Sequence, residues 1–443
     1  MKKILRVALA TILAFAVSLS LTPLAFADDP EPDRYLQAAI TKLLQVPIGT
    51  EFPDMTFNFS VTPSKFNDTN ILTSMPAIGT AGVVSINFTR AAATLEETVG
   101  GVSTYYLESA ELFGSVAWPS AGKYEYLIKE TGTSYVIADP LHEALALSPA
   151  EYLITVFVRE YKADDQEVLD GLASVGDRYI YTIGAMRIVT EEGEDGSVKV
   201  DPTPGGNQIN TFYSGMTFNN RYVKTNGAPD PDDPDLTDPD ESTLNISKMV
   251  EGDLGSLVWL FSFNITVTVP NLIPSYVLPF YKAYVVDASG AVDPAPNAAA
   301  SLIGTDASGL KYLKFVSGTS TAFKLSHGQK LVFVNTPVGT SYSTTESGEP
   351  GYIASVKVTT NGVQGAASTG ATGSGISVTG AYVGEAYNSA DVINTYDLTP
   401  PTGLSEDNLP FYALILLALG SLVAFIAFKR SRRQDITIPP IGT

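Results

Sequence analysis

Short runs in which apolar and polar residues alternate occupy most of the chain, and turn-forming residues separate them. Four clear runs, each rich in Val, Ile, Thr, Tyr or Phe, are MTFNFSV (55–61), KYEYLIKE (123–130), LFSFNITV (260–267) and SVKVTT (355–360). A period of two places one face of a strand in a core and the other toward solvent. Helical periodicity is rare, although residues 142–153 are expected to form a short helix before the strand YLITVFVREY. Many short strands with turn signals between them predict β-sandwiches.

A polar segment divides these strands into two groups. Residues 225–242 read TNGAPDPDDPDLTDPDES, with many Pro and Asp and no apolar period. Such a segment stays extended and solvated, so we expect an acidic linker at 225–243 between domains at 28–224 and 244–398. The aspartates lack the Asp-x-Asp-x-Asp-Gly pattern of a calcium loop, which favours a hinge over a calcium site. The predicted fold class is all-β, with two tandem sandwiches.

The first 27 residues have the three parts of a secretory signal peptide. The start carries three basic residues, an apolar run follows, and Ala25-Phe26-Ala27 supplies a small-x-small cleavage site. A membrane anchor is the weaker interpretation, because Ser and Pro interrupt the apolar run. We therefore expect secretion, with a mature chain that begins at Asp28.

The other end of the chain, residues 399–443, has the features of a membrane anchor. The apolar stretch 409–428 has roughly 20 residues, enough to span a bilayer as a helix. Four basic residues follow it directly and would hold that end in the cytoplasm: Lys429, Arg430, Arg432 and Arg433. A Pro-Pro-Thr-Gly segment precedes the apolar stretch.

Composition excludes several classes of function. The chain has 443 residues, no Cys and two His, so disulfides, zinc–thiolate sites and a Cys nucleophile are excluded. Its formal charge is −20, and without the two ends it is near −24, from 27 − 7 = 20 basic and 47 − 3 = 44 acidic residues. This charge argues against a nucleic-acid partner. Carboxylate pairs are plentiful, but none is placed as a glycosidase requires, so we expect neither an enzyme nor a cofactor.

Two predicted strands each carry a lysine within a row of apolar residues that face the core. The first row is Ala38, Ile40, Lys42, Leu44 and Val46, and the second is Leu244, Ile246, Lys248 and Val250. A buried lysine is costly unless it is paired or neutral. Each lysine therefore needs a partner.

Asparagine and glutamate occupy similar positions on other predicted strands. Asn220 shares a face with Met216, Phe218 and Tyr222, and Asn394 shares one with Val392, Tyr396 and Leu398. Glu130 follows Tyr124, Tyr126 and Ile128 on one face, and Glu346 follows Tyr342 and Thr344. A single case would indicate an edge strand or a buried ion pair. The order Lys, Glu, Asn occurs once in each predicted domain, which favours a shared chemical role.

Buried together, these three side-chain types can form an amide bond within the chain. Desolvation lowers the pKa of a lysine, so its amine can be neutral and nucleophilic. It raises the pKa of a glutamate, which can then donate to the asparagine carbonyl and shuttle protons. Attack on the asparagine Cγ with loss of ammonia leaves a Lys–Asn isopeptide bond, and burial excludes water. This reaction occurs once per site, so it does not make the protein an enzyme.

Both predicted domains resemble isopeptide-linkage modules of Gram-positive pilins and surface adhesins. In the first, ITKLLQVPIG, MTFNFSVTP, AGKYEYLIKE and MTFNNRY resemble the streptococcal pilin isopeptide-linkage domain. In the second, LNISKMVEGD, TPVGTSYSTTESGEPGY and VINTYD resemble the related modules that precede wall-sorting signals, and residues 337–352 resemble the Cna-B-like repeats of collagen adhesins. The resemblance implies Ig-like or Cna-B-like sandwiches, a Lys42–Asn220 bond with Glu130, and a Lys248–Asn394 bond with Glu346. Its Asn-x-Tyr pattern and the shared face favour Asn220 over Asn219.

The segment Thr399-Pro400-Pro401-Thr402-Gly403 resembles the Leu-Pro-x-Thr-Gly sorting signal of Gram-positive surface proteins, with Thr399 at the leucine position. The resemblance implies that a sortase attacks the carbonyl of Thr402 and releases Gly403 with the membrane segment. The implied partners are sortase, the membrane before sorting, and then peptidoglycan or neighbouring pilin subunits. The implied location is the cell wall of a Gram-positive bacterium, and a plain single-span anchor is the alternative.

Two functions stay open at this point. A pilin-type subunit would be joined through Thr402 to a lysine of the next subunit, whereas a monomeric adhesin would be attached to peptidoglycan and bind a ligand. No Tyr-Pro-Lys motif occurs in the chain, and nothing in the sequence selects Lys199 or Lys224 as the acceptor.

Overall fold

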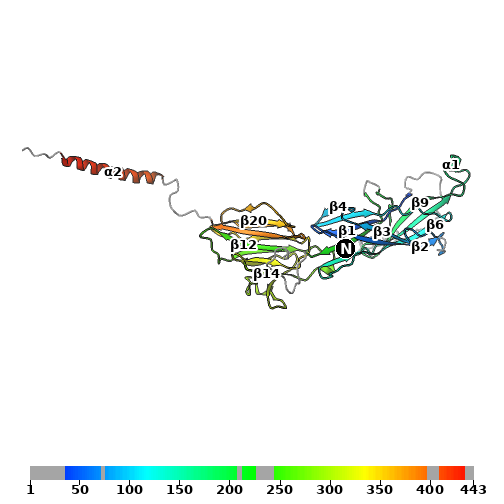
Figure 1. Ribbon diagram of the computed structural model, residues 1–443, viewed down its shortest axis with the longest axis horizontal. Coiled ribbons are helices and arrows are strands. Elements are labelled where there is room, and N and C mark those ends of the chain that lie inside the picture. The colour runs from blue at the N-terminus through cyan, green and yellow to red at the C-terminus, as the bar shows by residue number, and fades with distance from the viewer. Residues whose placement is uncertain (1–34, 71–74, 207–211, 226–243, 397–408, 435–443) are drawn as a thin grey trace, which may run out of the picture.

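The computed structural model describes residues 35–70, 75–206, 212–225, 244–396 and 409–434 (Figure 1). These residues form two pairs of β-sheets and one long helix near the C-terminus. The prediction of an all-β fold with two tandem sandwiches is confirmed. The predicted signal peptide at 1–27, linker residues 226–243 and the sorting motif at 399–403 lie outside the described residues.

The first sandwich extends from Thr41 to Lys224. Its elements are β1 Thr41–Pro47, β2 Met55–Phe66, β3 Val83–Phe88, β4 Thr94–Val99, β5 Val102–Glu108, β6 Gly122–Thr133, β7 Glu143–Ala146, β8 Glu151–Glu160, α1 Gln166–Leu169, β9 Arg178–Val189, β10 Asp195–Val200 and β11 Thr217–Lys224. One sheet has the order β4-β5-β1-β11-β7, and the other has the order β10-β9-β8-β6-β2-β3. The first and last strands, β1 and β11, are therefore hydrogen-bonded neighbours, and they run parallel.

The second sandwich extends from Leu244 to Tyr396. Its elements are β12 Leu244–Glu251, β13 Phe261–Thr268, η1 Pro274–Tyr276, β14 Tyr281–Val286, η2 Ala300–Leu302, β15 Ile303–Thr305, β16 Lys311–Phe315, β17 Thr321–Leu325, β18 Lys330–Phe333, β19 Ser341–Glu346, β20 Tyr352–Thr360, β21 Val363–Gln364, β22 Ser368–Thr369, β23 Ile376–Tyr382 and β24 Ser389–Tyr396. The larger sheet has the order β15-β16-β14-β18-β12-β24-β20-β21, with β22 also paired to β20, and the smaller has the order β17-β13-β19-β23. Here too the first and last strands, β12 and β24, are parallel neighbours.

Alternation along the strands builds each core. In the first sandwich, Phe57 and Phe59 of β2, Tyr126 of β6 and Phe218 of β11 are fully buried between the two sheets. The Tyr126 hydroxyl is satisfied because it donates to the Pro76 carbonyl oxygen at 3.0 Å. Any polar side chain on these inward faces is therefore enclosed by aromatic and aliphatic groups.

The predicted helix at 142–153 is wrong. The segment forms strand β7, then a turn through Ser148 and Pro149, and then strand β8. Pro149 interrupts a helix at its centre, and β7 pairs antiparallel with β11, which gives its backbone the hydrogen bonds that a helix would supply. Tertiary pairing thus overrides the helical preference of the Glu-Ala-Leu-Ala run.

The two sandwiches meet end to end (Figure 1) through several polar contacts. The Val338 amide donates to the Lys224 carbonyl oxygen at 2.9 Å. The Lys224 ammonium lies 2.7 Å from a carboxylate oxygen of Glu385, and the same carboxylate accepts a hydrogen bond from the Glu51 amide. The end of β11 is therefore fixed to loops of the second sandwich.

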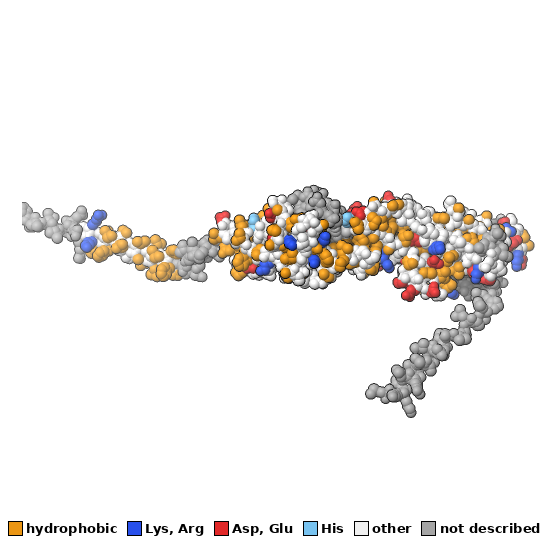
Figure 2. Space-filling model, turned by 90° about the horizontal axis from the view of Figure 1, so that it is seen from below, with side chains coloured by type: hydrophobic (Ala, Val, Ile, Leu, Met, Phe, Trp, Pro, Cys, Tyr) orange, Lys and Arg blue, Asp and Glu red, His pale blue; other side chains and the backbone are white. Residues whose placement is uncertain are grey.

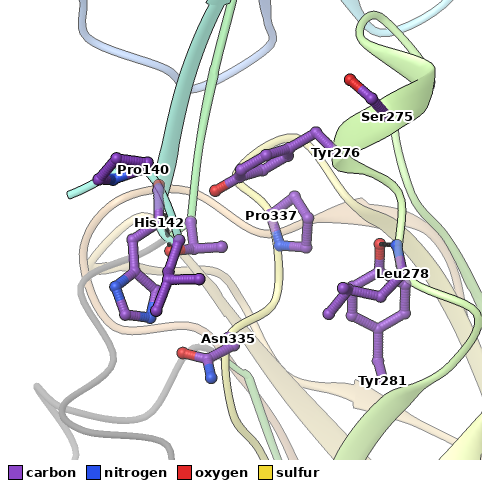
Figure 3. Close-up of a pocket in the computed structure, with 10 residues that line it drawn as sticks. Pro140, His142, Ser275, Tyr276, Leu278, Tyr281, Asn335 and Pro337 are labelled. Atoms are coloured by element: carbon purple, nitrogen blue, oxygen red, sulfur yellow. Dashed lines mark hydrogen bonds between the residues drawn. The ribbon is translucent and has the colours of Figure 1, made fainter. Parts of the chain in front are cut away.

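A cavity of about 300 Å³ lies beside these contacts (Figure 3). His142 contributes to it from the first sandwich, and its Nδ1 lies 2.6 Å from Asp139 Oδ2. Tyr276, Tyr281 and Asn335 line it from the second sandwich. The cavity is thus bounded by aromatic rings, an imidazole and an amide.

Helix α2, Leu409–Gln434, begins where the sequence predicts the apolar stretch and continues through the basic residues. Within Pro410–Ser431, the most apolar stretch of 18 residues has a mean hydropathy of 2.5, and none of that stretch is covered by other described residues. Figure 2 shows apolar side chains along this helix and basic side chains near one of its ends. By length and composition this helix can cross a membrane.

Candidate functional site

Strands β1 and β12 each place one lysine inside a core. Both strands alternate regularly, so Lys42 points inward between Ile40 and Leu44, and Lys248 points inward between Ile246 and Val250. The accessible surface of both lysines is 0% of its maximum. A lysine this deeply buried needs a specific partner.

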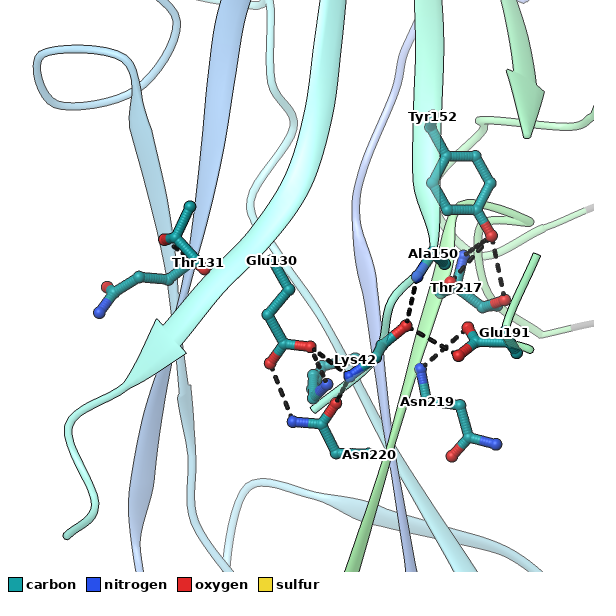
Figure 4. A network of polar contacts seen from close by, with 11 residues as sticks. Lys42, Glu130, Thr131, Ala150, Tyr152, Glu191, Thr217, Asn219 and Asn220 are labelled. Atoms are coloured by element: carbon teal, nitrogen blue, oxygen red, sulfur yellow. Dashed lines mark hydrogen bonds and ion pairs between the residues drawn. The ribbon is translucent and has the colours of Figure 1, made fainter. Parts of the chain in front are cut away.

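In the first sandwich, Glu130 contacts both Lys42 and Asn220 (Figure 4). Lys42 Nζ lies 3.1 Å from Glu130 Oε2, and the Asn220 amide nitrogen donates to Glu130 Oε1 at 2.9 Å. The side chain of Glu130 and the whole of Asn220 are 0% exposed. Glu130 thus contacts both nitrogens, one with each oxygen.

The second sandwich contains the same arrangement. Lys248 Nζ lies 3.2 Å from Glu346 Oε1 and 3.1 Å from Glu346 Oε2. The Asn394 amide nitrogen donates to Glu346 Oε1 at 2.6 Å. Glu346 and Asn394 are each 1% exposed, so this site is also closed to solvent.

Strand register explains why the two sites match. In the parallel pair β1–β11, Lys42 lies opposite Phe218, two residues before Asn220. In the pair β12–β24, Lys248 lies opposite Val392, again two residues before Asn394. The asparagine therefore shares a face with the lysine and is one pleat farther along the neighbouring strand.

The glutamate comes from the opposite sheet in both sandwiches. Glu130 pairs with Phe59 across β6 and β2, and Glu346 pairs with Phe263 across β19 and β13. The aromatic residue two positions earlier covers the lysine: Nζ of Lys42 is 4.6 Å from the Phe57 ring centre, and Nζ of Lys248 is 4.1 Å from that of Phe261. Sequence reasoning missed these two aromatic residues, although a Phe-x-Phe pattern occurs at the same place in both halves.

Burial changes the acidity of these groups. It lowers the pKa of Lys42 to about 8, and the attraction of Glu130 opposes this shift only in part. Burial likewise lowers the pKa of Lys248 to about 8 against the attraction of Glu346. Burial also raises the pKa of Glu346, which favours its protonated form. Each lysine therefore yields a neutral amine at much lower pH than an exposed lysine does.

The asparagine amides are oriented differently from the sequence-based expectation. In both sites the amide nitrogen, and not the carbonyl oxygen, faces the glutamate. A carboxylate that already accepts from an ammonium can only accept again, so it takes the N–H of the amide. In the first sandwich, the backbone N–H of Ser148 donates instead to Asn220 Oδ1, at 2.7 Å.

Two further polar residues lie beside the first site, and sequence reasoning missed both. Ser148 precedes β8, and Glu191 follows β9 and contacts Ser148 and the backbone of Asn219 (Figure 4). The side chain of Asn219 does not reach Glu130, so the structure brings Asn220 to the lysine and glutamate and leaves Asn219 outside. No sequence pattern indicates Ser148 or Glu191, because loops bring them to the site.

Comparisons with known proteins find one family model that matches part of the chain. A family model described as "Domain of unknown function (DUF7601)" matches residues 242–396, which include the whole second sandwich. No curated protein matches the sequence.

The solved structures to which the chain is similar include three pilus proteins. The major pilin from Streptococcus pyogenes is 16% identical over 82% of this chain and 99% of that chain, with a TM-score of 0.29. The major pilin protein T-13 from Streptococcus pyogenes serotype GAS131465 is 14% identical over 81% of this chain and 97% of that chain, with a TM-score of 0.27. The pilus-presented adhesin Spy0125 (Cpa) is 18% identical over 53% of this chain and 41% of that chain, with a TM-score of 0.21. Identities and TM-scores this low assign no function, so the function must come from the residues themselves.

Proposed function

We propose that this protein is a structural surface protein of the bacterial cell wall, a pilin-type subunit in which each sandwich forms its own Lys–Asn isopeptide bond. The observation that carries the proposal is the duplicated site. A buried lysine, glutamate and asparagine meet in the same strand register in both sandwiches. A buried ion pair alone requires no asparagine and no repeated stagger.

The contacts of Glu130 suit a proton relay between the attacking and the leaving nitrogen. Its Oε2 accepts from Lys42 Nζ, and its Oε1 accepts from Asn220 Nδ2. The proton that leaves Nζ passes to the carboxylate, and the carboxyl group returns a proton to Nδ2. The Nζ–Cγ bond forms and the Cγ–Nδ2 bond breaks, so an amine and a primary amide become a secondary amide and ammonia. Glu346 relates Lys248 and Asn394 in the same way.

The position of the two bonds suits a protein under tension. Each bond joins the first strand of a sandwich to its last strand, where the chain enters and leaves the fold. A pulling force between the chain ends then passes through the covalent bond and does not strip strands from the sheets. The bonds close loops of 220 − 42 = 178 and 394 − 248 = 146 residues. In a chain without cysteine, these bonds would give the stability that disulfides give other secreted proteins, because each restricts the unfolded chain.

Peptide mapping tests the bonds. A protease digest should contain one peptide with Lys42 joined to the peptide with Asn220, and another with Lys248 joined to the peptide with Asn394. Each joined pair should be absent when the corresponding glutamate is replaced, in Glu130→Ala or Glu346→Ala. A digest that contains only the four separate peptides would refute this part of the proposal.

We further infer that the C-terminal segment is a sorting signal, with Thr402 joined by a sortase to peptidoglycan or to a neighbouring subunit. The apolar helix α2 and the basic residues at its end support a membrane-held precursor. In the producing cell, the mature protein should be released by a muramidase, and Thr402→Ala should stay in the membrane fraction. Equal distribution of the two proteins would indicate a plain membrane anchor.

A polymer also needs an acceptor lysine. Lys224 is held by Glu385 at the junction of the sandwiches, whereas Lys199 is exposed on the edge strand β10. Between these two lysines, the exposed Lys199 is therefore the better candidate acceptor. A ladder of covalent multimers on a denaturing gel of wall extract, lost in Lys199→Ala and kept in Lys224→Ala, would support the pilin-type function.

The alternative is a monomeric wall-anchored adhesin, and the cavity between the sandwiches favours it. Tyr276, Tyr281 and His142 give this cavity the aromatic and polar lining of a small-ligand site (Figure 3). One discrete band in the same wall extract would support the adhesin and contradict polymerisation.

A further inference from the structure

A second carboxylate lies beside the site of the first sandwich, and the proton relay described above does not use it. Glu191 Oε2 accepts a hydrogen bond from the Ser148 hydroxyl at 2.8 Å. Its Oε1 accepts from the backbone N–H of Asn219 at 3.1 Å. Burial raises the pKa of Glu191, and these two hydrogen bonds oppose the shift. Glu191 thus joins the turn before β8 to the residue that precedes the reactive Asn220 (Figure 4).

The turn before β8 aims one backbone donor at the reactive amide. The Ser148 N–H lies 2.7 Å from Asn220 Oδ1, and it is also 3.1 Å from Glu130 Oε2. Ser148 is 6% exposed, and its hydroxyl accepts from the Ala150 N–H at 3.2 Å, which fixes the turn from the other side. Attack of Lys42 on Cγ moves the π electrons of the carbonyl onto Oδ1. A rigid N–H at that oxygen is the arrangement that stabilises such an oxyanion.

The position of this donor depends on Glu191. The Ser148 N–H and Asn220 Oδ1 belong to segments that are far apart in the sequence: Ser148 lies in the connection between β7, which pairs with β11, and β8, which belongs to the other sheet. One carboxylate holds the hydroxyl of the donor residue and the amide next to the acceptor residue. If this carboxylate is removed, the turn loses the side chain that links it to the backbone of Asn219, and only the β7–β11 pairing, two residues earlier, still holds the Ser148 N–H near Oδ1.

The second sandwich has the same three reactive residue types, but no backbone N–H in the part of the chain that the structure describes contacts its asparagine carbonyl oxygen. Asn394 Oδ1 is buried and has no hydrogen-bond partner among the described residues. Glu346 contacts only the nitrogen side of that amide. A tetrahedral intermediate at Asn394 therefore places its negative charge on an oxygen that no donor contacts.

We propose that the backbone N–H of Ser148 is an oxyanion donor for the Lys42–Asn220 reaction and that Glu191 is the positioning residue that holds it. The proposal rests on the isopeptide chemistry proposed above. In the balanced step, the Nζ–Cγ bond forms while the carbonyl electrons move to Oδ1 and are stabilised by the N–H. The electrons return as the Cγ–Nδ2 bond breaks, and ammonia leaves with the proton that Glu130 relays. The first sandwich therefore closes its bond faster than the second.

The experiment follows both bonds in the same molecules. Full-length chain is made by a short labelled pulse of cell-free synthesis with detergent, chased, and quenched in acid at intervals. Proteolysis and mass spectrometry against labelled standards then give the fraction of each joined peptide pair with time. Loss of one oxyanion donor slows other acyl transfers by roughly 10²–10³-fold. We expect the first bond to form at least about tenfold faster than the second by the same principle.

Substitutions distinguish the positioning role of Glu191 from an effect of its negative charge. Glu191→Ala should slow the first bond by about tenfold or more and leave the second unchanged. Glu191→Gln should regain most of the lost rate, because its oxygen can accept from Asn219 and its amide can donate to the Ser148 hydroxyl. Glu192→Ala is the matched control, since it removes the same charge from the adjacent, exposed residue. Ser148→Ala removes the contact to Glu191 and should resemble Glu191→Ala.

The possible results overturn different parts of the proposal. Equal rates in Glu191→Ala and the unaltered chain, or no rescue by Glu191→Gln, would overturn the positioning role. Equal rates for the two bonds in the unaltered chain would overturn the oxyanion donor. If Glu191→Ala loses the protease resistance of the first sandwich, Ser148→Ala carries the test. Absence of both joined peptides from the unaltered chain would refute the isopeptide chemistry itself.

Discussion

Removal of one isopeptide bond should lower the stability of one sandwich by an amount that the loop length sets. Asn220→Ala prevents the bond and keeps the Lys42–Glu130 ion pair. The bond closes a loop of 220 − 42 = 178 residues. By the chain-entropy relation for cross-links, a loop of this size contributes about 5 kcal/mol to the free energy of unfolding. For a sandwich of this size, that corresponds to a fall in Tm of roughly 10–20 °C.

The substitution also has a local cost that must be separated. It removes one acceptor of the buried Ser148 N–H, which costs about 1–3 kcal/mol. In a Glu130→Ala background no bond forms, so Asn220→Ala there measures the local cost without the cross-link. The Ser148 N–H has then also lost Glu130 Oε2, so this value is an upper limit, and the difference between the two effects of Asn220→Ala is a lower limit for the cross-link.

Differential scanning calorimetry of residues 28–402 is the assay, with one transition followed for each sandwich. The transition of the second sandwich is the internal reference, because its bond stays intact in Asn220→Ala. A cross-link contribution below about 1 kcal/mol, in protein whose mass shows the bond, would refute the entropy argument.

Four further results are expected. The rate of both bonds should rise with pH and level off above about pH 8, where the buried lysines lose their protons, and a flat rate profile from pH 6 to 9 would contradict this. In uncrosslinked Asn220→Ala, the unfolded chain binds more protons than the folded chain between about pH 8 and pH 10.5. Its free energy of unfolding should therefore rise with pH across that window, relative to Lys42→Met combined with Asn220→Ala, in urea titrations at pH 8 and 10. Asn219→Ala should keep the joined peptides, and a loss of the first pair would assign the bond to the wrong asparagine. Lys224→Ala should change the free energy of unfolding by less than about 1 kcal/mol, because its ion pair with Glu385 is partly exposed.

Much of the candidate site can be predicted from the sequence because strand parity is a local property. Lys42 and Lys248 interrupt apolar rows of period two, and a row of that kind can only face a core. The same parity separates Asn220 from Asn219, and the structure brings only Asn220 to the glutamate. The all-β fold follows from the same alternation.

The alternation of residues along a strand does not predict features that depend on contacts between segments far apart in the sequence. The segment around Leu145 has a helical composition, yet β7 adds to the edge of a sheet because β11 is available there. Ser148 and Glu191 reach the site through turns after β7 and β9, and no periodic pattern positions a turn. The orientation of the Asn220 amide is likewise decided by its neighbours, since the Ser148 N–H takes the carbonyl side.

The intact mass of denatured residues 28–402 tests the central claim most directly. Each Lys–Asn bond releases one ammonia, about 17 Da, so two bonds predict a mass about 34 Da below that of the sequence. Glu130→Ala combined with Glu346→Ala should restore the full mass expected for that variant. A mass equal to that of the unmodified sequence would contradict the account and leave the two buried sites as ion pairs.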